Sequence, residues 1–386
     1  MKYMSTELKR GLEGVVVAES DLSYIDGDAG ELIYRGYAIE ELAREASYEE
    51  TLYLLWHDEL PSETELTEFS QQMAAARELD DGVLDIIREL AASGEEPMAA
   101  LRTITSALSA YDPDADAEFN DTEANNRKSR RITAKMPTAL AAYNRLRNGN
   151  EPVAPREELS HAANFLYMLN DEEPDDVLAE TFDMALVLHA DHGLNASTFA
   201  AMVTASTLAD LHSAVTSAIG TLSGSLHGGA NADVMRMLQA IDDDKLDPVE
   251  WVKDAIDRGE RIAGFGHRVY NVKDPRAKIL QQRLEELTEE SGQTKWLEYT
   301  DTIEKYLTDE KGLPEKGIAP NVDYYSGAVY YKLGIPIDMY TPIFAMARSG
   351  GWLAHVLEYQ EDNRLIRPRG RYVGPDDRDV IPIDER

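Results

Sequence analysis

The chain has 386 residues, carries a formal net charge of −34 at pH 7 and contains no cysteine. Hydrophobic residues make up 43% of it, enough to bury a substantial core, so we do not expect disorder. The missing cysteines exclude disulfides and thiolate metal sites. So acidic a chain is a poor partner for nucleic acid or an anionic membrane. No run of about 18 apolar residues predicts a membrane span, and the start lacks the apolar centre of a signal peptide. We therefore expect a cytoplasmic protein.

The acidic excess, 72 acidic against 38 basic residues, favours a protein that works in concentrated salt. At about 1 M salt the screening length falls to about 3 Å, so repulsion between surface carboxylates becomes tolerable. We interpret the charge as an adaptation to a salt-rich cytoplasm, that is, as halophilic. The alternative, an ordinary acidic enzyme, stays open.

Strand-like patterns are confined to the N-terminal end, at residues 14–20 (GVVVAES) and 31–37 (ELIYRGY). Elsewhere apolar residues recur at spacings of three and four, which predicts helices. The clearest of these helices cover residues 49–60, 82–94, 137–149, 158–169 and 248–259. Pro137 and Pro248 suit first-turn positions. The sequence lacks the alternation of strands and helices that would predict a parallel sheet.

Residues 111–131 change abruptly from acidic to basic. Aspartate, asparagine and proline dominate the first half, as is typical of loops. We expect an exposed loop that leads into a helix.

Residues 189–198 (HADHGLNAST) hold two histidines three positions apart. His189 and His192 would share one helix face, a spacing that can hold a metal ion. No third ligand of an obvious kind accompanies them. Metal ligands, histidines packed in a buried helix and a hydrogen-bond donor to a substrate all stay open.

Residues 220–231 (GTLSGSLHGGAN) place His227 among glycines. The pattern that follows predicts a helix from residue 230, so the positive end of that helix should keep His227 neutral. A neutral histidine can donate a hydrogen bond to an enolate as it forms. The glycine run does not match a phosphate loop, because the lysine is absent. A histidine without a chemical role is the alternative.

Residues 261–277 (RIAGFGHRVYNVKDPRA) place His267 after two glycines, with Arg276 nine residues further on. Glycines let a ligand approach the backbone, and an arginine can bind a carboxylate through two hydrogen bonds. The alternative is a tight turn with a solvated arginine.

Residues 319–336 predict a helix that starts after Pro320 and Asn321 and stops before Gly334. Asp323 then lies in the first turn, where the helix dipole favours its charge while burial would raise its pKa. Without further context, an ordinary helix-start aspartate is the alternative.

The tail, residues 363–386, crowds Arg364, Arg367, Arg369 and Arg371 into eight positions. Its prolines predict extended backbone rather than helix. A carboxylate base, neutral histidine donors and arginines suit carbon-acid chemistry on an anionic substrate. The residues alone do not name the reaction.

Eight segments, in order and spacing, resemble the citrate synthase family over nearly the whole chain. They are GELIYRGYAIEELA (30–43), AKMPTALAAY (134–143), HADHGLNAST (189–198), LHGGAN (226–231), GFGHRVY (264–270), DPRA (274–277), PNVDYYSG (320–327) and NRLIRPRGRYVG (363–374). Any one could be chance, whereas the ordered set is highly specific.

The resemblance implies condensation of acetyl-CoA with oxaloacetate, followed by hydrolysis to citrate and CoA. By position, Asp323 would remove a proton from the acetyl methyl group. His227 would hydrogen-bond the thioester oxygen, and His267 would polarise and protonate the oxaloacetate carbonyl. A methyl group beside a thioester is a weak acid, so a positioned donor must meet the charge on oxygen. Acetyl-CoA is a substrate, so neither a cofactor nor a metal is expected.

The resemblance also implies binding residues. Oxaloacetate would be held by His192, Arg276 and Arg348 (in FAMARSGGW), with Arg367 arriving from the partner subunit of a homodimer. CoA would bind the backbone that leads into the second catalytic histidine, at Arg261, Ile262, Ala263, Gly264 and Phe265.

The implied architecture is the all-α, two-domain citrate synthase fold with a short N-terminal β element. The large domain would comprise residues 1–224 and 331–386 and form the dimer interface. The small domain, residues 225–330, would bind CoA and close over the substrate.

Two positions depart from the family pattern. Position 271, commonly basic in relatives and able to meet CoA phosphate, is Asn271, which leaves Lys273 or Arg268 as candidate substitutes. Gly193 replaces a residue that is usually acidic, which bears on its neighbour His192.

Three other functions stay open. A 2-methylcitrate synthase would share the fold and mechanism but prefer propionyl-CoA, since one methylene in an apolar pocket changes binding by only about 1–3 kcal/mol. A non-catalytic helical dimer that binds acyl-CoA would be favoured had His227, His267 or Asp323 been replaced. A metal hydrolase using His189 and His192 would need further ligands.

Overall fold

A computed structural model describes residues 8–375 and 378–386. Within them the chain forms sixteen α-helices: α1 (Ile39–Glu45), α2 (Tyr48–His57), α3 (Glu63–Ala75), α4 (Asp81–Ser93), α5 (Pro97–Leu108), α6 (Thr122–Arg147), α7 (His161–Asn170), α8 (Asp176–His189), α9 (Ala196–Ala205), α10 (Leu211–Leu222), α11 (Ala230–Asp243), α12 (Pro248–Asp257), α13 (Pro275–Ser291), α14 (Lys295–Lys305), α15 (Val322–Lys332) and α16 (Tyr340–Glu361). Short helical turns cover Arg10–Leu12, Ser109–Tyr111, Tyr306–Glu310, Leu313–Lys316, Ile337–Met339 and Ile383–Glu385. No described helix is long and apolar enough to cross a membrane.

One small antiparallel sheet precedes the helices, with β1 (Ser23–Asp26), β2 (Glu31–Tyr34) and β3 (Tyr37–Ala38) in the order β1-β2-β3. The strand prediction at residues 31–37 is confirmed. The one at residues 14–20 is wrong, because that segment has no strand beside it and Val16 is 86% exposed. Strand propensity needs a partner to form a ladder.

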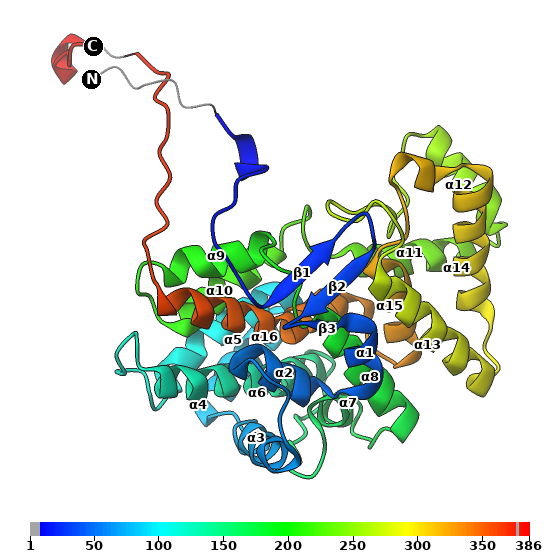
Figure 1. Ribbon diagram of the computed structural model, residues 1–386, viewed down its shortest axis with the longest axis horizontal. Helices are drawn as coiled ribbons and strands as arrows, with labels where there is room; N and C mark the ends of the chain where they lie inside the picture. Colours follow the sequence, from blue (N-terminus) through cyan, green and yellow to red (C-terminus); the bar gives the residue numbers. More distant parts are fainter. Residues whose placement is uncertain (1–7, 376–377) are drawn as a thin grey trace.

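Helix α16 lies at the centre of the fold, in contact with α2, α6, α8 and α9, while α10 packs along α9. Figure 1 shows α11 to α15 gathered to one side of these helices. The main hydrophobic cluster is continuous through both groups, from Leu52 and Trp352 to Tyr324. The all-α class with a short N-terminal β element is confirmed, whereas the division into two domains stays a prediction.

Local sequence signals account for many of the helix ends. Ser47 and Glu50 form a capping box at the start of α2, and α4 ends at Gly94 in the left-handed conformation. All five predicted helices are confirmed as parts of α2, α4, α6, α7 and α12. The placement of Pro137 in a first turn is wrong, because α6 begins at Thr122 and continues through it.

The prediction for residues 111–131 is confirmed, because residues 112–121 form a loop with no buried residue that leads into α6 at Thr122. Arg131 forms ion pairs with Asp112 and Asp114 at 2.6 Å each, and only 3% of the Asp112 side chain is exposed. The acidic half of the segment therefore folds back onto its basic half, which is already part of α6. Opposite charges close in sequence explain both the local order and the longer helix.

Candidate active site

Two loops meet to bring His267 and Asp323 into one region. The Gly266 N–H donates to the Ala319 carbonyl, and the Asn321 N–H donates to the Gly264 carbonyl, both at 2.9 Å. The Asn321 side-chain amide also donates to the Gly266 carbonyl at 2.9 Å. The segment that leads into His267 is thereby joined to the start of α15, which carries Asp323.

Gly264 is required at this junction. Its φ of +79° is in the left-handed region, and a Cβ atom there would lie 2.7 to 2.8 Å from Tyr324. Any side chain would separate the two loops. The group that comes close to the backbone at this glycine is Tyr324 of the same chain, and the predicted approach of a ligand stays a prediction.

Asp323 lies in the first turn of α15, where its N–H donates to the Asn321 side-chain oxygen at 3.0 Å. Burial raises the pKa of Asp323 to about 6, even though Arg276 and Arg348 favour its charged form. Burial thus outweighs the helix dipole, and the carboxylate is a stronger base than an exposed aspartate.

His267 is a neutral ring with a defined tautomer. Its Nδ1 accepts hydrogen bonds from the N–H groups of Val269 (3.0 Å) and Tyr270 (3.2 Å), so the proton sits on Nε2. Burial and the nearby Arg276 lower the pKa of His267 to about 4. The ring can therefore donate a hydrogen bond from Nε2 without being charged.

His192 lies beside His267, with ring centroids 5.2 Å apart, and its Nε2 is 3.3 Å from the Tyr270 hydroxyl. The prediction that it shares a helix face with His189 is wrong, because α8 ends at His189 and His192 lies in the loop before α9. His189 is fully buried and donates from Nδ1 to the Ala185 carbonyl at 2.7 Å. Among the described residues no three His, Asp or Glu side chains are arranged to hold a metal ion.

His227 is held by the first turn of α9. Its Nε2 accepts the Ser197 N–H at 3.2 Å and lies 2.8 Å from the Ser197 hydroxyl, which also accepts the Trp352 ring N–H at 3.1 Å. The proton of the neutral ring is therefore on Nδ1. Burial and the charge of Arg348 lower the pKa of His227 to about 4. The ring is neutral, as predicted, but burial and the charge of Arg348 make it so rather than the helix dipole.

The glycines after His227 shape the turn that carries it. A Cβ atom at Gly228 would lie 2.3 Å from the Leu222 carbonyl oxygen, and Gly229 has φ +99° directly before α11. Only glycine permits that packing and that backbone angle. A hollow of about 270 Å³ lies behind this turn, lined in part by Gly228, Asp233 and Thr341.

Arg276 and Arg348 are both buried, each 2% exposed. Arg276 donates from Nε and one terminal nitrogen to Asp274, at 3.0 and 2.8 Å. Arg348 donates from Nε to the His189 carbonyl at 2.6 Å. Two guanidinium groups, two neutral donor histidines and a basic carboxylate suit proton abstraction beside a carbonyl in a substrate that bears carboxylates.

A sequence profile described as "Citrate synthase, C-terminal domain" matches residues 11–369. The chain is 69% identical to the citrate synthase of Haloferax volcanii, over 99% of this chain and 100% of that relative. The chain belongs to the citrate synthase family.

Two further comparisons agree with this family. A 2-methylcitrate synthase of Mycobacterium tuberculosis is 41% identical over 97% of this chain and 93% of its own length. The solved citrate synthase of Thermoplasma acidophilum, a ternary complex with carboxymethyl coenzyme A and oxaloacetate, has a TM-score of 0.91 and is 34% identical over 99% of this chain and 100% of its own. The 2-methylcitrate synthase is thus the more distant of the two enzymes compared by sequence.

The family's predicted CoA segment varies in exposure. Arg261 is exposed, Ile262 and Gly264 are buried, and Ala263 and Phe265 are intermediate.

The side chains near the two departures from the family pattern have defined partners. The Asn271 amide donates to Asp28 at 2.7 Å, and Lys273 pairs with Glu304 at 2.7 Å, so neither is poised for phosphate. Arg268 is exposed and is the better candidate. Gly193 has φ +59°, a left-handed conformation that favours glycine.

Among the predicted site residues, Arg367 is the one that lies apart from the others within a single chain. It is exposed and lies in the tail that follows α16 and extends away from the helices in Figure 1. The Ile366 N–H donates to the Ser206 hydroxyl at 3.1 Å, which fixes the root of the tail at the end of α9.

The sequence analysis missed the residues that hold the histidines, chiefly Ser197, Tyr270 and Trp352. Ser197 and Tyr270 lie inside the family segments quoted above, so those segments were a usable signal. Trp352 ends the segment quoted for Arg348, but its contact with Ser197 follows only from the packing of α16 against α9.

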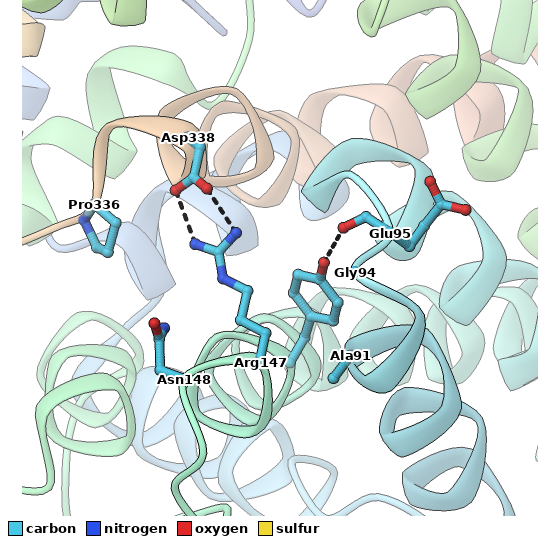
Figure 2. A pocket seen from close by; sticks show the side chains of 8 residues that line it. Ala91, Gly94, Glu95, Arg147, Asn148, Pro336 and Asp338 are labelled. Carbon is cyan, nitrogen blue, oxygen red and sulfur yellow. Dashed lines mark hydrogen bonds and ion pairs between the residues drawn. The ribbon is translucent and has the colours of Figure 1, made fainter.

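A larger hollow of about 490 Å³ lies elsewhere, between α4, α6 and the Ile337–Met339 turn. Figure 2 shows Arg147 bound to Asp338, at 2.6 and 2.8 Å. The Tyr143 hydroxyl donates to the Glu95 carbonyl. None of the predicted site residues lines it. Its polar groups pair with one another, so it is not the candidate active site.

Proposed function

We propose that this enzyme condenses acetyl-CoA with oxaloacetate and hydrolyses the resulting thioester to citrate and CoA. The observation that carries the proposal is that a carboxylate whose pKa is raised to about 6 and two neutral histidines of opposite tautomer all lie near enough to Arg276 or Arg348 for that charge to act on them. The family membership and the ligands named for the Thermoplasma relative support the same substrates.

In the first step the Asp323 carboxylate removes a proton from the acetyl methyl group. His227 donates its Nδ1–H to the thioester oxygen, so that the negative charge of the forming enolate is met by a fixed donor. Because its pKa is about 4, the ring stabilises the enolate as a neutral hydrogen-bond donor.

In the second step the enolate carbon attacks the carbonyl of oxaloacetate. His267 donates from Nε2 to that carbonyl oxygen and transfers its proton as the carbon–carbon bond forms. His192, Arg276 and Arg348 hold the carboxylates of oxaloacetate, and Arg367 of a second subunit completes the set. Water then cleaves the thioester and releases CoA.

We further propose a homodimer whose small domain, residues 225–330, closes over the substrates, while residues 1–224 and 331–386 form the large domain. Helix α15 runs to Lys332, so the second boundary falls in its last turn. The Phe265 and Pro320 backbones pair directly, which makes the CoA segment and the Asp323 helix a single unit during closure. A cytoplasmic, salt-rich setting and a place in the tricarboxylic acid cycle fit the acidic surface and the Haloferax relative.

The test is release of CoA thiol from acetyl-CoA and from propionyl-CoA, each with and without oxaloacetate, at low and multimolar potassium chloride. Oxaloacetate-dependent release that favours acetyl-CoA supports the proposal. A preference for propionyl-CoA would assign the enzyme to the 2-methylcitrate branch. No release by a folded dimer would leave acyl-CoA binding without catalysis.

A further inference from the structure

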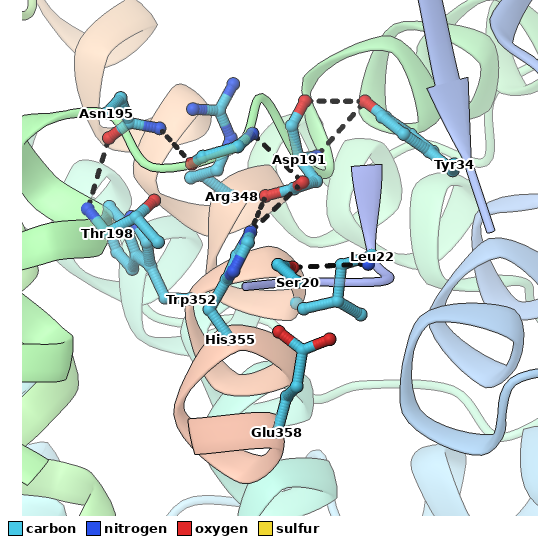
Figure 3. A network of polar contacts seen from close by, with 12 residues as sticks. Ser20, Leu22, Tyr34, Asp191, Asn195, Thr198, Arg348, Trp352, His355 and Glu358 are labelled. Atoms are coloured by element: carbon cyan, nitrogen blue, oxygen red, sulfur yellow. Dashed lines mark hydrogen bonds and ion pairs between the residues drawn. The ribbon is translucent and has the colours of Figure 1, made fainter. Parts of the chain in front are cut away.

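One face of α16 contacts the loop that carries His192. Arg348, Gly351 and His355 stand at positions i, i+3 and i+7 of this helix and so share that face. The loop between α8 and α9 packs against it, with the Gly351 N–H donating to the Ala190 carbonyl at 3.1 Å. Figure 3 shows Asp191 of this loop between His355 and Tyr34.

Asp191 is completely buried and is held from three sides. The His355 Nε2 lies 3.2 and 3.3 Å from its two carboxylate oxygens. The Gly193 N–H donates to the same carboxylate at 3.1 Å, and the Tyr34 hydroxyl donates to the Asp191 carbonyl at 2.7 Å. A Cβ atom at Gly351 would lie 2.6 Å from the carboxylate, so only glycine lets it sit so close to the helix.

Arg348 has no such side-chain partner. Its Nε donates to the His189 carbonyl, and among the described residues no protein atom accepts from its two terminal nitrogens. In Figure 3 its guanidinium points away from His355. Arg276 differs, because Asp274 occupies both its Nε and one terminal nitrogen.

The charges of Asp191 and Arg348 nevertheless stabilise each other. Burial lowers the pKa of Arg348 to about 10 and Asp191 opposes that shift. Although burial acts in the other direction, His355 and Arg348 hold the pKa of Asp191 at about 2. The Arg348 guanidinium lies over the Phe344 ring at 4.6 Å, but a carboxylate within reach of a guanidinium frequently forms a bidentate pair with it. Here the carboxylate is already engaged by His355 and Gly193.

We propose that His355 is a positioning residue that holds the Asp191 carboxylate away from Arg348. The guanidinium then keeps a nearby counter-charge while its terminal nitrogens stay available to a carboxylate of the substrate. This inference rests on the proposed function, in which Arg348 binds oxaloacetate.

The test compares His355→Leu with His355→Gln, a variant that keeps an N–H donor. In His355→Leu the carboxylate is free to pair with Arg348, so KM for oxaloacetate should rise about tenfold or more while kcat and KM for acetyl-CoA change less than about threefold. His355→Gln should stay near the wild type. Adding Asp191→Asn to His355→Leu should restore KM for oxaloacetate, because an amide has no charge to pair with Arg348.

An equal rise of KM in the single and the double variant would overturn the proposal, since that is what loss of packing produces. No rise in His355→Leu would overturn it as well. If His355→Leu does not fold, Asp191→Asn decides alone: a rise in KM contradicts the proposal, whereas unchanged or tighter oxaloacetate binding supports it.

Calorimetric titration of oxaloacetate separates this inference from the proposed function. A wild type that binds oxaloacetate but does not turn over contradicts the proposed function, and the variants' affinities then decide the role of His355. A wild type that binds no oxaloacetate contradicts both.

Discussion

At the scale of single residues, each proposed catalytic histidine is a donor because a backbone N–H group occupies its other nitrogen. The Ser197 N–H donates to Nε2 of His227, and the N–H groups of Val269 and Tyr270 donate to Nδ1 of His267. A backbone donor cannot become an acceptor, so the tautomers are fixed by the fold. The sequence predicted neutral histidines but not which nitrogen of each carries the proton.

The pKa of Asp323 predicts the acid limb of the pH profile. The carboxylate acts as a base only when ionised, and burial raises its pKa to about 6. kcat/KM for acetyl-CoA should therefore be constant above that pH and fall about tenfold per unit below it. The pKa values of His227 and His267, both about 4, lie below this limb. A profile flat down to pH 5 would contradict the assignment.

Removal of the His227 ring should affect the reaction rather than the fold. The residue sits in a turn shaped by Gly228 and Gly229 and is only partly buried. His227→Ala should lower kcat by about 10²–10⁴ and leave the melting temperature within a few degrees. Stopped assays of CoA release together with calorimetry check this, and a turnover near that of the wild type would remove His227 from the mechanism.

At the scale of elements, the N-terminal hairpin supports the His267 loop. The Asn271 N–H donates to the Gly27 carbonyl at 2.9 Å, and a Cβ atom at Gly27 would lie 2.0 Å from the Val269 carbonyl oxygen. Val269 in turn donates to His267. The turn between β1 and β2 thus fixes a loop more than 200 residues away.

Gly27→Ala should therefore impair the site. The added methyl group must displace the Val269 backbone, which we expect to destabilise the protein by about 1–3 kcal/mol and to lower turnover about tenfold through misplacement of His267. Gly220→Ala is the matched control, because a Cβ atom there meets only Arg102 at an ordinary 3.7 Å. Equal turnover in both variants would argue against the hairpin's role.

Elements were predictable wherever local signals agreed with packing. The five periodic helices and the starts of α11 and α15 follow from spacing and caps. The predictions for residues 14–20 and for Pro137 were wrong because each depends on neighbours distant in sequence. Residues 14–20 have no partner strand, and Pro137 is held inside a 26-residue helix by packing along that helix. The arrangement of Asp191, Gly351 and His355 had no sequence signal for the same reason.

At the scale of the whole molecule, the net charge of −34 predicts stability that depends on salt. Screening lengths fall from about 10 Å at 0.1 M to about 3 Å at 1 M, so self-repulsion should weaken as potassium chloride is added. The melting temperature should rise steeply between these concentrations. A melting temperature independent of salt would favour an ordinary acidic enzyme.

The proposed contribution of Arg367 across a dimer can be tested with mixed subunits. Arg367→Ala and Asp323→Asn should each be nearly inactive alone. Hybrids formed by reassociation contain one site with both native residues, so an equal mixture should recover roughly a quarter of the wild-type turnover. No recovery, with hybrid formation verified by mass spectrometry, would place Arg367 in its own subunit's site, and an Arg367→Ala enzyme that is active alone would place it outside any site.

The central claim is that Asp323 removes the methyl proton, and Asp323→Asn tests it most directly. The amide keeps the size of the side chain but cannot accept the proton. We predict that oxaloacetate-dependent CoA release falls by about 10²–10⁴, while calorimetry finds oxaloacetate bound within about threefold of the wild-type affinity. Turnover near the wild-type rate in the folded variant would contradict the account.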